Sequence, residues 1–385
     1  MSNFNQIIFT PAEFARLARI DRNMIPLIEE SGLLSTIRQK VGNVDRKMVT
    51  LEGAQNYFRA VRQLVESGQI GRRGDQSESA PQATEPTPAA EGQAPQMGDG
   101  AEAAGAPMAV ESLRREMTAH DAVVAAATAY KFGTPKHKLQ MFYNVKGGTG
   151  KSTLTAQFVM RAAMMGLRVL AVDLDGQGHL TVNLDVLEGH ELPTVYDVLI
   201  NDLPIEQAII SVAPGLDLLP ANLGLCNIEI PLNQKPRREY RLSEALEKVA
   251  PHYDLIVADT NPAASILNSS MLVAAQSVNV VCATNPLSFH GMSLVMATID
   301  EMKREFRRQL DVKIIPNMYD AREVISQEVL GELQGQFAEN CTRTVVNRSA
   351  DLNEATKRRS TVWEVSSKGQ AAQDIDALAE ELIFG

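Results

Sequence analysis

The chain is poor in the features that mark secreted, membrane-spanning and fibrous proteins. Its 385 residues include three widely spaced cysteines, Cys226, Cys282 and Cys341, which form neither a disulfide framework nor a zinc-binding pattern. No apolar run approaches the roughly 20 residues of a membrane span, and residues 1–10 lack the basic-then-apolar profile of a signal peptide. We expect buried thiols in a reducing compartment, a cytoplasmic protein, and two or three domains of about 150 residues each.

Positive charge is absent from residues 74–107, which hold six acidic residues and no basic one. This stretch is rich in alanine, proline and glycine and has no aromatic residue, so it buries too little surface to offset its ordering entropy. We predict a flexible acidic linker; an ordered irregular arm lying on a partner is the alternative. Helical spacing from Val110 to Tyr130 predicts a connecting helix within residues 108–137.

The segment before this linker is basic, although the whole chain carries a formal charge of −10. Residues 1–73 contain 11 Lys and Arg against 7 Asp and Glu, a balance of +4. A net acidic chain ordinarily disfavours nucleic acid as a partner, but a basic head and an acidic body behave as separate objects. The global charge therefore does not exclude DNA binding by residues 1–73, which we treat as a domain.

Beyond residue 138, short apolar runs alternate with amphipathic segments. Strands are expected at residues 139–145, 168–174, 216–220, 255–259, 278–283 and 312–316, and helices at residues 151–165, 241–250, 292–310, 324–337 and 371–382. Short strands without polar alternation, separated by helices, indicate a parallel sheet covered on both faces. The predicted fold class is α/β, a doubly wound and mostly parallel sheet over residues 138–385.

A glycine-rich loop follows the first of these strands and leads directly into a helix. Backbone N–H groups of such a loop turn toward phosphates, and the helix dipole adds positive potential at the same point. Lys151 is expected to reach the β- and γ-phosphates, and the Ser152 hydroxyl to ligate Mg²⁺. The predicted nucleotide-binding residues are Lys146, Gly147, Gly148, Thr149, Gly150, Lys151, Ser152, Thr153 and Asn317.

This loop differs from the common phosphate loop, because its first glycine would fall at Asn144 and a second lysine, Lys146, opens it. The run KGGTGKS resembles the deviant Walker A motif of the ParA/MinD family of ATPases, and the resemblance covers nearly all of residues 138–385. RVLAVDLDGQGHLT resembles the family's VLLxDxDPQGNxT, and YDLIVADTNPA resembles its Walker B motif, YDxIIIDxPP. The resemblance implies a P-loop NTPase that hydrolyses ATP slowly with Mg²⁺.

The resemblance also implies roles for individual residues. Lys146, Lys151 and Asp175 would be catalytic, Lys146 by crossing a dimer interface to the partner's phosphates and Asp175 by orienting the attacking water. Ser152, Asp173 and Asp259 would hold Mg²⁺ or its waters. Gly176 and Asn261 stand where the family has proline, and we expect both to loosen the backbone near the γ-phosphate and to affect the hydrolysis rate.

The N-terminal segment carries helix-start signals. Thr10 precedes Pro11 as an N-cap, Glu13 completes a capping box, and a second helix is expected over residues 25–30, ending at Gly32. The run F-T-x-x-E-F-A-x-L resembles a MerR-type helix-turn-helix, for which residues 35–54 would supply the wing. Pro26 restricts the first turn of the presumed recognition helix. A small helical dimerisation module without DNA contacts is the alternative.

Two groups of basic residues are the predicted DNA contacts. The N-terminal group would bind a specific operator, and the second falls where ParA proteins carry non-specific DNA contacts. A weaker candidate cluster lies on the helix expected over residues 292–310. The two groups consist of Arg22, Arg38, Lys40, Arg46 and Lys47, and of Lys357, Arg358 and Arg359.

These features together predict a plasmid or chromosome partition ATPase. The resemblance implies an ATP-bound homodimer that binds DNA non-specifically, associates with the nucleoid, is stimulated by a ParB-like centromere-binding partner and represses its own operon. A positioning ATPase for a protein cargo and an ATP-modulated transcriptional regulator remain alternatives. A membrane-bound MinD-like role is disfavoured because the C-terminal run DIDALAEELIFG is acidic, whereas surface-binding helices are basic on their polar face.

Overall fold

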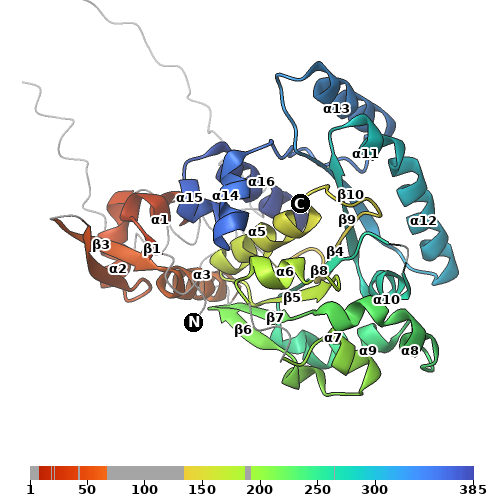
Figure 1. Ribbon diagram of the computed structural model, residues 1–385. Coiled ribbons are helices and arrows are strands. Elements are labelled where there is room, and N and C mark those ends of the chain that lie inside the picture. Colours follow the sequence, from red (N-terminus) through yellow and green to blue (C-terminus); the bar gives the residue numbers. More distant parts are fainter. Residues whose placement is uncertain are drawn as a thin grey trace, which may run out of the picture.

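The computed structural model describes residues 8–18, 20, 22–41, 44–66, 134–186, 192–263 and 265–385. The predicted linker and the predicted helix over residues 110–130 lie outside these ranges. Figure 1 shows a large α/β domain with a small N-terminal unit beside it. Within the described ranges, no helix combines the length and the apolarity that crossing a membrane requires.

A seven-stranded sheet forms the centre of the large domain. In spatial order its strands are β10 (Asp311–Asn317), β9 (Ser277–Ala283), β4 (Leu139–Tyr143), β8 (Leu255–Thr260), β5 (Val169–Leu174), β7 (Leu216–Leu219) and β6 (Ile210–Ala213). All neighbours are parallel except β6, which runs antiparallel to β7 at the edge. The predicted parallel sheet is confirmed, with each predicted strand within two residues of its observed ends. The short, bulged edge strand β6 was not predicted.

Helices cover both faces of the sheet. One face carries α5 (Lys151–Met164), α6 (His179–Asn183), α14 (Ala350–Arg358), α15 (Val362–Ser366) and α16 (Gln370–Phe384). The other carries α7 (Val195–Ile200), α8 (Glu229–Asn233), α9 (Arg241–Val249), α10 (Ile266–Ala274), α11 (Pro286–His290), α12 (Met292–Glu305) and α13 (Val324–Gln336). Alternate strand residues enter the two cores: Leu255 and Val257 face α5, and Ile256 and Ala258 face α9. The five predicted helices are present, although α12 ends five residues earlier than expected.

The N-terminal unit consists of β1 (Ile8–Phe9), α1 (Pro11–Ala18), the 3₁₀ turn η2 (Arg22–Met24), α2 (Ile25–Glu30), β2 (Thr36–Val41), β3 (Val44–Thr50) and α3 (Leu51–Glu66). Its strands form an antiparallel sheet in the order β1-β3-β2. The predicted capping box is present: the Thr10 N–H donates to Glu13 Oε2 at 2.8 Å, and the Glu13 N–H donates to Thr10 Oγ1 at 3.3 Å. The 16-residue helix α3 was not predicted.

Helix α3 joins the N-terminal unit to the large domain. Gln55 is buried, and its Nε2 donates to the carbonyl of Ala163 at 3.0 Å and to the carbonyl of Pro214. Phe58 lies against the turn after α5, where a Cβ on Gly166 would come within 2.6 Å of the Phe58 Cβ. Since Gly166 also has φ +83°, only glycine allows this approach without strain.

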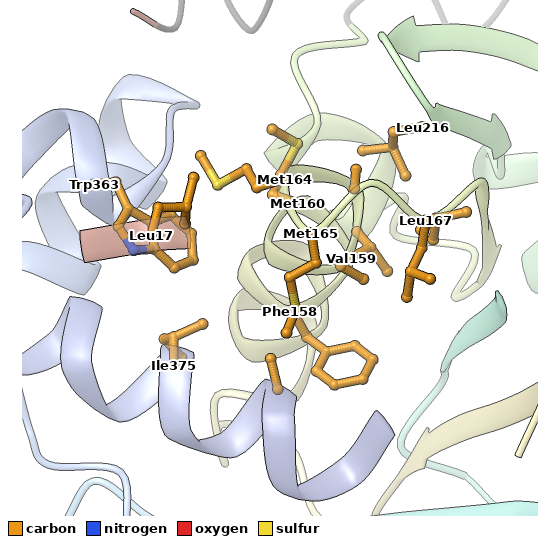
Figure 2. Close-up of a cluster of buried hydrophobic side chains, with 14 of the residues drawn as sticks. Leu17, Phe158, Val159, Met160, Met164, Met165, Leu167, Leu216, Trp363 and Ile375 are labelled. Carbon is orange, nitrogen blue, oxygen red and sulfur yellow. The ribbon is translucent and has the colours of Figure 1, made fainter. Parts of the chain in front are cut away.

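The two units also share one hydrophobic core. Leu17 of α1 lies near Trp363 of α15 and the methionines at the end of α5, as Figure 2 shows. Arg62 of α3 forms an ion pair with Asp254 at 3.3 Å, just before β8. The N-terminal unit is therefore packed against the α5 face of the sheet as part of the same core, rather than held only by the chain between them.

Candidate functional site

A cavity of about 340 Å³ lies at the carboxyl ends of the parallel strands, where α5 begins. The loop between β4 and α5 forms one wall, and the segments that follow β5 and β8 form the others. This edge of an open α/β sheet is where such folds bind ligands. The lining residues are Lys146, Gly147, Gly148, Thr149, Gly150, Lys151, Ser152, Thr153, Asp175, Gln177, His179, Asn183, Pro262 and Thr356.

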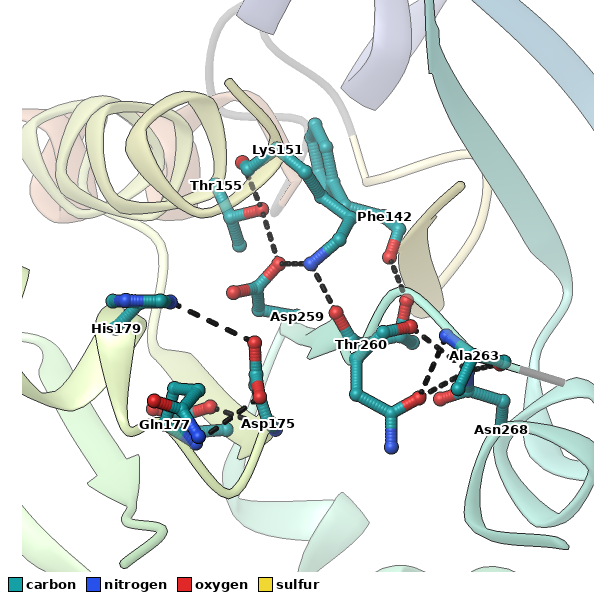
Figure 3. Close-up of polar contacts among 12 residues, drawn as sticks. Phe142, Lys151, Thr155, Asp175, Gln177, His179, Asp259, Thr260, Ala263 and Asn268 are labelled. Atoms are coloured by element: carbon teal, nitrogen blue, oxygen red, sulfur yellow. Dashed lines mark hydrogen bonds and ion pairs between the residues drawn. The ribbon is translucent and has the colours of Figure 1, made fainter. Parts of the chain in front are cut away.

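Lys151 is the first residue of α5 and is almost completely buried, with 6% of its surface exposed. Its Nζ donates to Asp259 Oδ1 at 2.7 Å and to the carbonyl of Thr260. Figure 3 shows the side chain directed from the helix start toward both groups. The ammonium is thus desolvated at the entrance of a phosphate loop, next to a carboxylate, which is the charge arrangement that a Mg²⁺-bound polyphosphate requires.

Two buried oxygen atoms at this site have no hydrogen-bond partner within the described part of the chain: Asp259 Oδ2 and Thr149 Oγ1. A buried carboxylate oxygen without a donor is costly unless a ligand satisfies it. The Ser152 hydroxyl lines the same cavity. Carboxylate and hydroxyl oxygens are the ligands that Mg²⁺ prefers, together with phosphate oxygens. The residues present therefore fit a magnesium–nucleotide complex.

Asp173 lies on β5 opposite Asp259 of β8 and is fully buried. Burial and the charge of Asp259 raise the pKa of the Asp173 carboxyl. Its oxygens already accept three hydrogen bonds, from the Asp175 N–H at 3.0 Å and from the Thr181 N–H and Oγ1 at 2.8 and 2.7 Å. These bonds make Asp173 the residue that shapes the turn carrying Asp175, and they leave a predicted role toward Mg²⁺ to its waters.

Asp175 lines the cavity and keeps only 7% of its surface exposed. Its Oδ1 accepts the Gln177 N–H at 3.1 Å, and its Oδ2 lies 3.7 Å from Nδ1 of His179. Figure 3 shows His179 and Gln177 on either side of the carboxylate. His179, Gln177 and Asn183 were not among the predicted site residues, because a residue one helical turn beyond a motif has no signature of its own.

Lys146 borders the cavity and is directed toward α11. Its Nζ donates to Ser288 Oγ at 3.1 Å and to Asn285 Oδ1 at 3.4 Å. The flanking surface is apolar and exposed, with Leu287 77% exposed on α11 and Leu294 66% exposed on α12. The second lysine of the loop is therefore held in its own chain by polar groups that are weaker partners than a phosphate.

A second cavity, of about 320 Å³, shares Gly150 and Thr153 with the phosphate cavity. Asn317, at the end of β10, donates from Nδ2 to the Thr149 carbonyl at 2.7 Å and so fixes the phosphate loop against this second cavity. Apolar and amide groups line it, which suits a nucleoside. Asn317 was predicted from its place after a late strand; the remaining wall, formed by Met318, Asn347, Arg348, Ser349, Leu352 and Asn353, was not.

The expectation that Gly176 and Asn261 loosen the backbone is wrong. The Asn261 side chain and carbonyl are both bound by Nδ2 of the buried Asn268, at 2.8 and 3.0 Å. At Gly176, the turn that carries Cys226 lies so close that a Cβ would have no room. Both loops are held by side chains distant in sequence. The expectation that all three thiols are buried is also wrong, because Cys226 is exposed.

The predicted N-terminal DNA contacts are all exposed, on η2 and on the hairpin of β2 and β3. Arg38 pairs across the hairpin with Lys47, and Gln39 pairs with Arg46. Since cross-strand partners share a face, Arg38, Lys40 and Lys47 lie on one face and Arg46 on the other. Glu29 of α2 forms an ion pair with Lys47, so the presumed recognition helix contributes negative rather than positive charge.

The second predicted basic group ends α14. Lys357 and Arg358 are exposed, Arg358 forms an ion pair with Glu354 at 2.6 Å, and Arg359 terminates the helix with φ +52°. Thr356, the residue before this group, lines the phosphate cavity. The basic group is therefore adjacent to the nucleotide site, whereas the hairpin of the N-terminal unit lies on the far side of α5.

The sheet order, the loop between β4 and α5, and the buried lysine–aspartate pair define the class of protein: the chain is a P-loop NTPase. Comparisons with known proteins agree. A family model described as an AAA domain matches residues 137–312. Cell division protein PomZ of Myxococcus xanthus is 33% identical over 64% of this chain and 78% of its own length. Chromosome partitioning protein ParA of Caulobacter vibrioides is 30% identical over 62% of this chain and 91% of its own length.

A solved structure carries the same fold with ligands in place. Cobyrinic acid a,c-diamide synthase from Mycobacterium smegmatis with a bound ATP analogue and magnesium is 28% identical, covers 61% of this chain and 97% of its own, and has a TM-score of 0.51. The chain belongs to the family of ParA-type P-loop ATPases of partition proteins. It is an ATPase whose cofactors are ATP and Mg²⁺.

Proposed function

We propose that this protein partitions DNA by cycling between an ATP-bound homodimer and free subunits. The observation that carries the proposal is the position of Lys146. Its ammonium is held at the cavity rim by Ser288 and Asn285, beside the exposed apolar residues Leu287 and Leu294. An apolar surface next to a cation at the entrance of a nucleotide site favours coverage by a second subunit, which would present its own nucleotide to Lys146.

The chemistry of such a dimer is mainly positioning and charge neutralisation. Bound Mg²⁺ supplies charge neutralisation between the β- and γ-phosphates. Ser152 and Asp259 hold the ion, with Asp173 next to its waters, while Lys151 leaves the Asp259 carboxylate for the phosphates. Asp175 orients the attacking water, and Lys146 neutralises the partner's triphosphate. Because every step depends on closure, hydrolysis is slow without a stimulating partner.

DNA contacts are proposed at two places with different tasks. Lys357, Arg358 and Arg359, next to the nucleotide cavity, bind DNA non-specifically in the ATP-bound dimer, which places the protein on the nucleoid. Arg22 and the hairpin residues Arg38, Lys40, Arg46 and Lys47 bind an operator and repress the protein's own operon. A ParB-like protein on the centromere stimulates hydrolysis. The flexible linker over residues 74–107 separates this N-terminal domain (residues 1–73) from residues 108–385.

The test is the variant Lys146→Ala, mixed with a non-hydrolysable ATP analogue and Mg²⁺. We expect nucleotide affinity within about threefold of wild type, because Lys151 and the loop amides remain, but no dimer in light scattering. Lys248→Ala, an exposed lysine on α9, is the matched control and should dimerise normally. A Lys146→Ala dimer as stable as that of the wild type would overturn the proposal.

A positioning role for a protein cargo is the second candidate, favoured by the 33% identity to PomZ, which is named a cell division protein. It shares the ATP cycle and differs in what the dimer transports. Stimulation of hydrolysis by a centromere-bound protein supports partition, whereas stimulation by a protein that binds no centromere supports positioning.

A further inference from the structure

A short segment beside the phosphate cavity touches both loops that follow the central strands β5 and β8. It comprises the 3₁₀ turn η5 (Leu223–Asn227) and α8 (Glu229–Asn233), and we call residues 223–233 the bridge. The first loop contains Asp175 and Gln177, and the second contains Pro262; all three residues line the cavity. None of the bridge residues lines it, so the bridge acts on the cavity only through these loops.

The first contact of the bridge is with Gly176. A Cβ at this position would lie 2.7 Å from the Cys226 main-chain nitrogen and 2.5 Å from its Sγ. A main-chain atom cannot rotate away, so only glycine admits the bridge at this distance. Gln177 Nε2 also lies 3.8 Å from Cys226 Sγ. Gly176 thus allows the turn carrying Asp175 to rest directly on η5.

The second contact is with the start of α10, which follows the loop after β8. Glu229 Oε1 accepts the backbone N–H of Ile266, the first residue of this helix, at 3.0 Å. Two residues on, Asn268 donates to the Asn261 carbonyl, to Asn261 Oδ1 and to the Ala263 carbonyl at 2.6–3.0 Å. The bridge therefore fixes the helix whose side chain fixes the loop, and this loop begins at Thr260, whose carbonyl binds Lys151.

We propose that the bridge sets the spacing between the Asp175 turn and the loop after β8, with Glu229 as a positioning residue for ATP hydrolysis. Glu229 acts through the Ile266 N–H and makes no contact with nucleotide. Hydrolysis is sensitive to such spacing, since a displacement of about 1 Å can cost on the order of 100-fold in rate. Nucleotide binding depends on the phosphate loop, which the bridge does not touch, so the two properties separate. The proposal rests on the ATPase assignment of the cavity.

The experiment compares Glu229→Ala with Glu229→Gln in the full-length protein with Mg²⁺. Single-turnover ATP hydrolysis, nucleotide affinity and ATP-dependent light scattering are measured for each. In Glu229→Ala the Ile266 N–H loses its acceptor, and we expect hydrolysis about tenfold slower, with affinity and light scattering within twofold of wild type. Glu229→Gln keeps Oε1 as an acceptor and should restore the rate. Ile230→Ala, a neighbour on α8 that is 73% exposed, is the matched control.

A double-mutant cycle tests whether the two contacts form one device. Gly176→Ala forces Cys226 away from the other end, so it should slow hydrolysis as Glu229→Ala does, and the double variant should be no slower than the slower single variant. Multiplicative effects, a wild-type rate in Glu229→Ala, or a parallel loss of nucleotide affinity would each overturn the proposal. If Glu229→Ala does not fold, a wild-type rate in Gly176→Ala overturns it. A wild-type protein that does not hydrolyse ATP contradicts the ATPase assignment instead.

Discussion

The phosphate cavity and the N-terminal unit differ in where their polar groups find partners. Around the cavity, buried oxygens of Thr149 and Asp259 have none in the described chain, and Lys151 pairs with a carboxylate that Mg²⁺ would also use. In the N-terminal unit, Gln55 and Glu13 are bound by groups of the large domain, Ala163 and Ser367. Unsatisfied buried groups indicate a ligand site, whereas satisfied ones indicate a structural interface. The unit is thus built for docking, and only its exposed hairpin is left for a ligand.

The strongest test of this contrast is Phe58→Ala at the interface. Removing a buried phenylalanine that faces the Gly166 turn should cost about 3–5 kcal/mol of stability, measured by denaturant unfolding. Because both units share one core, the loss should appear in a single transition. Glu52→Ala, an exposed position on the same helix, should change little. Two separate transitions in the wild type would contradict the shared core.

Lys151→Ala tests the other side of the comparison. The β/γ-phosphate charge loses its main protein counter-ion, so ATP affinity should fall at least about 100-fold, measured by calorimetry. Because the lysine is matched to a ligand rather than to the fold, the N-terminal unit should stay docked and the unfolding transition should stay single. Unchanged ATP affinity would remove the phosphate-loop assignment.

The double variant Arg38→Ala/Lys40→Ala tests the exposed hairpin. If these residues contact phosphates, affinity for operator DNA should drop about tenfold, and the salt dependence of binding should weaken by about two charges. Protein stability should be unchanged, because both residues are exposed. Fluorescence anisotropy at several salt concentrations measures both quantities, with Lys248→Ala as the control. An unaltered salt slope would favour the dimerisation module.

Arg62→Ala gives the smallest expected effect and carries a pH signature. Burial acts to raise the pKa of Asp254, but hydrogen bonds from Arg168 and the charges of Arg62 and Arg168 outweigh it, and the pKa lies below its usual value. Such a carboxylate stabilises the fold above the unfolded-state pKa, and the contribution disappears as pH falls through the folded-state pKa. The variant should lose about 0.5–1 kcal/mol near pH 7, and the difference should shrink below about pH 4 in unfolding experiments. A difference that grows with acid would be inconsistent with the ion pair.

The parts of the protein that sequence reasoning predicted are those in which one residue type is needed at a fixed offset. Lys151 and Ser152 follow the loop glycines, Asp259 ends a buried strand, and Thr10 with Glu13 begins a helix; each requirement is local. The contacts that were not predicted join distant residues. Nothing near Gly176 in the sequence indicates Cys226, and nothing in α3 indicates that Gln55 binds the carbonyl of Ala163. Only the assembled sheet brings these groups together.

The turn at Gly166 has a consequence for protein engineering. Its main chain already adopts the left-handed conformation and leaves free the space that Phe58 occupies, so the ATPase domain carries a receptor for its own N-terminal unit. A related ATPase with a side-chain-bearing residue at this turn would not accept the unit as a graft, whatever linker joined the two. Conversely, a chimera that keeps α3, the Gly166 turn and the Pro214 carbonyl should allow the hairpin to be exchanged for another recognition element.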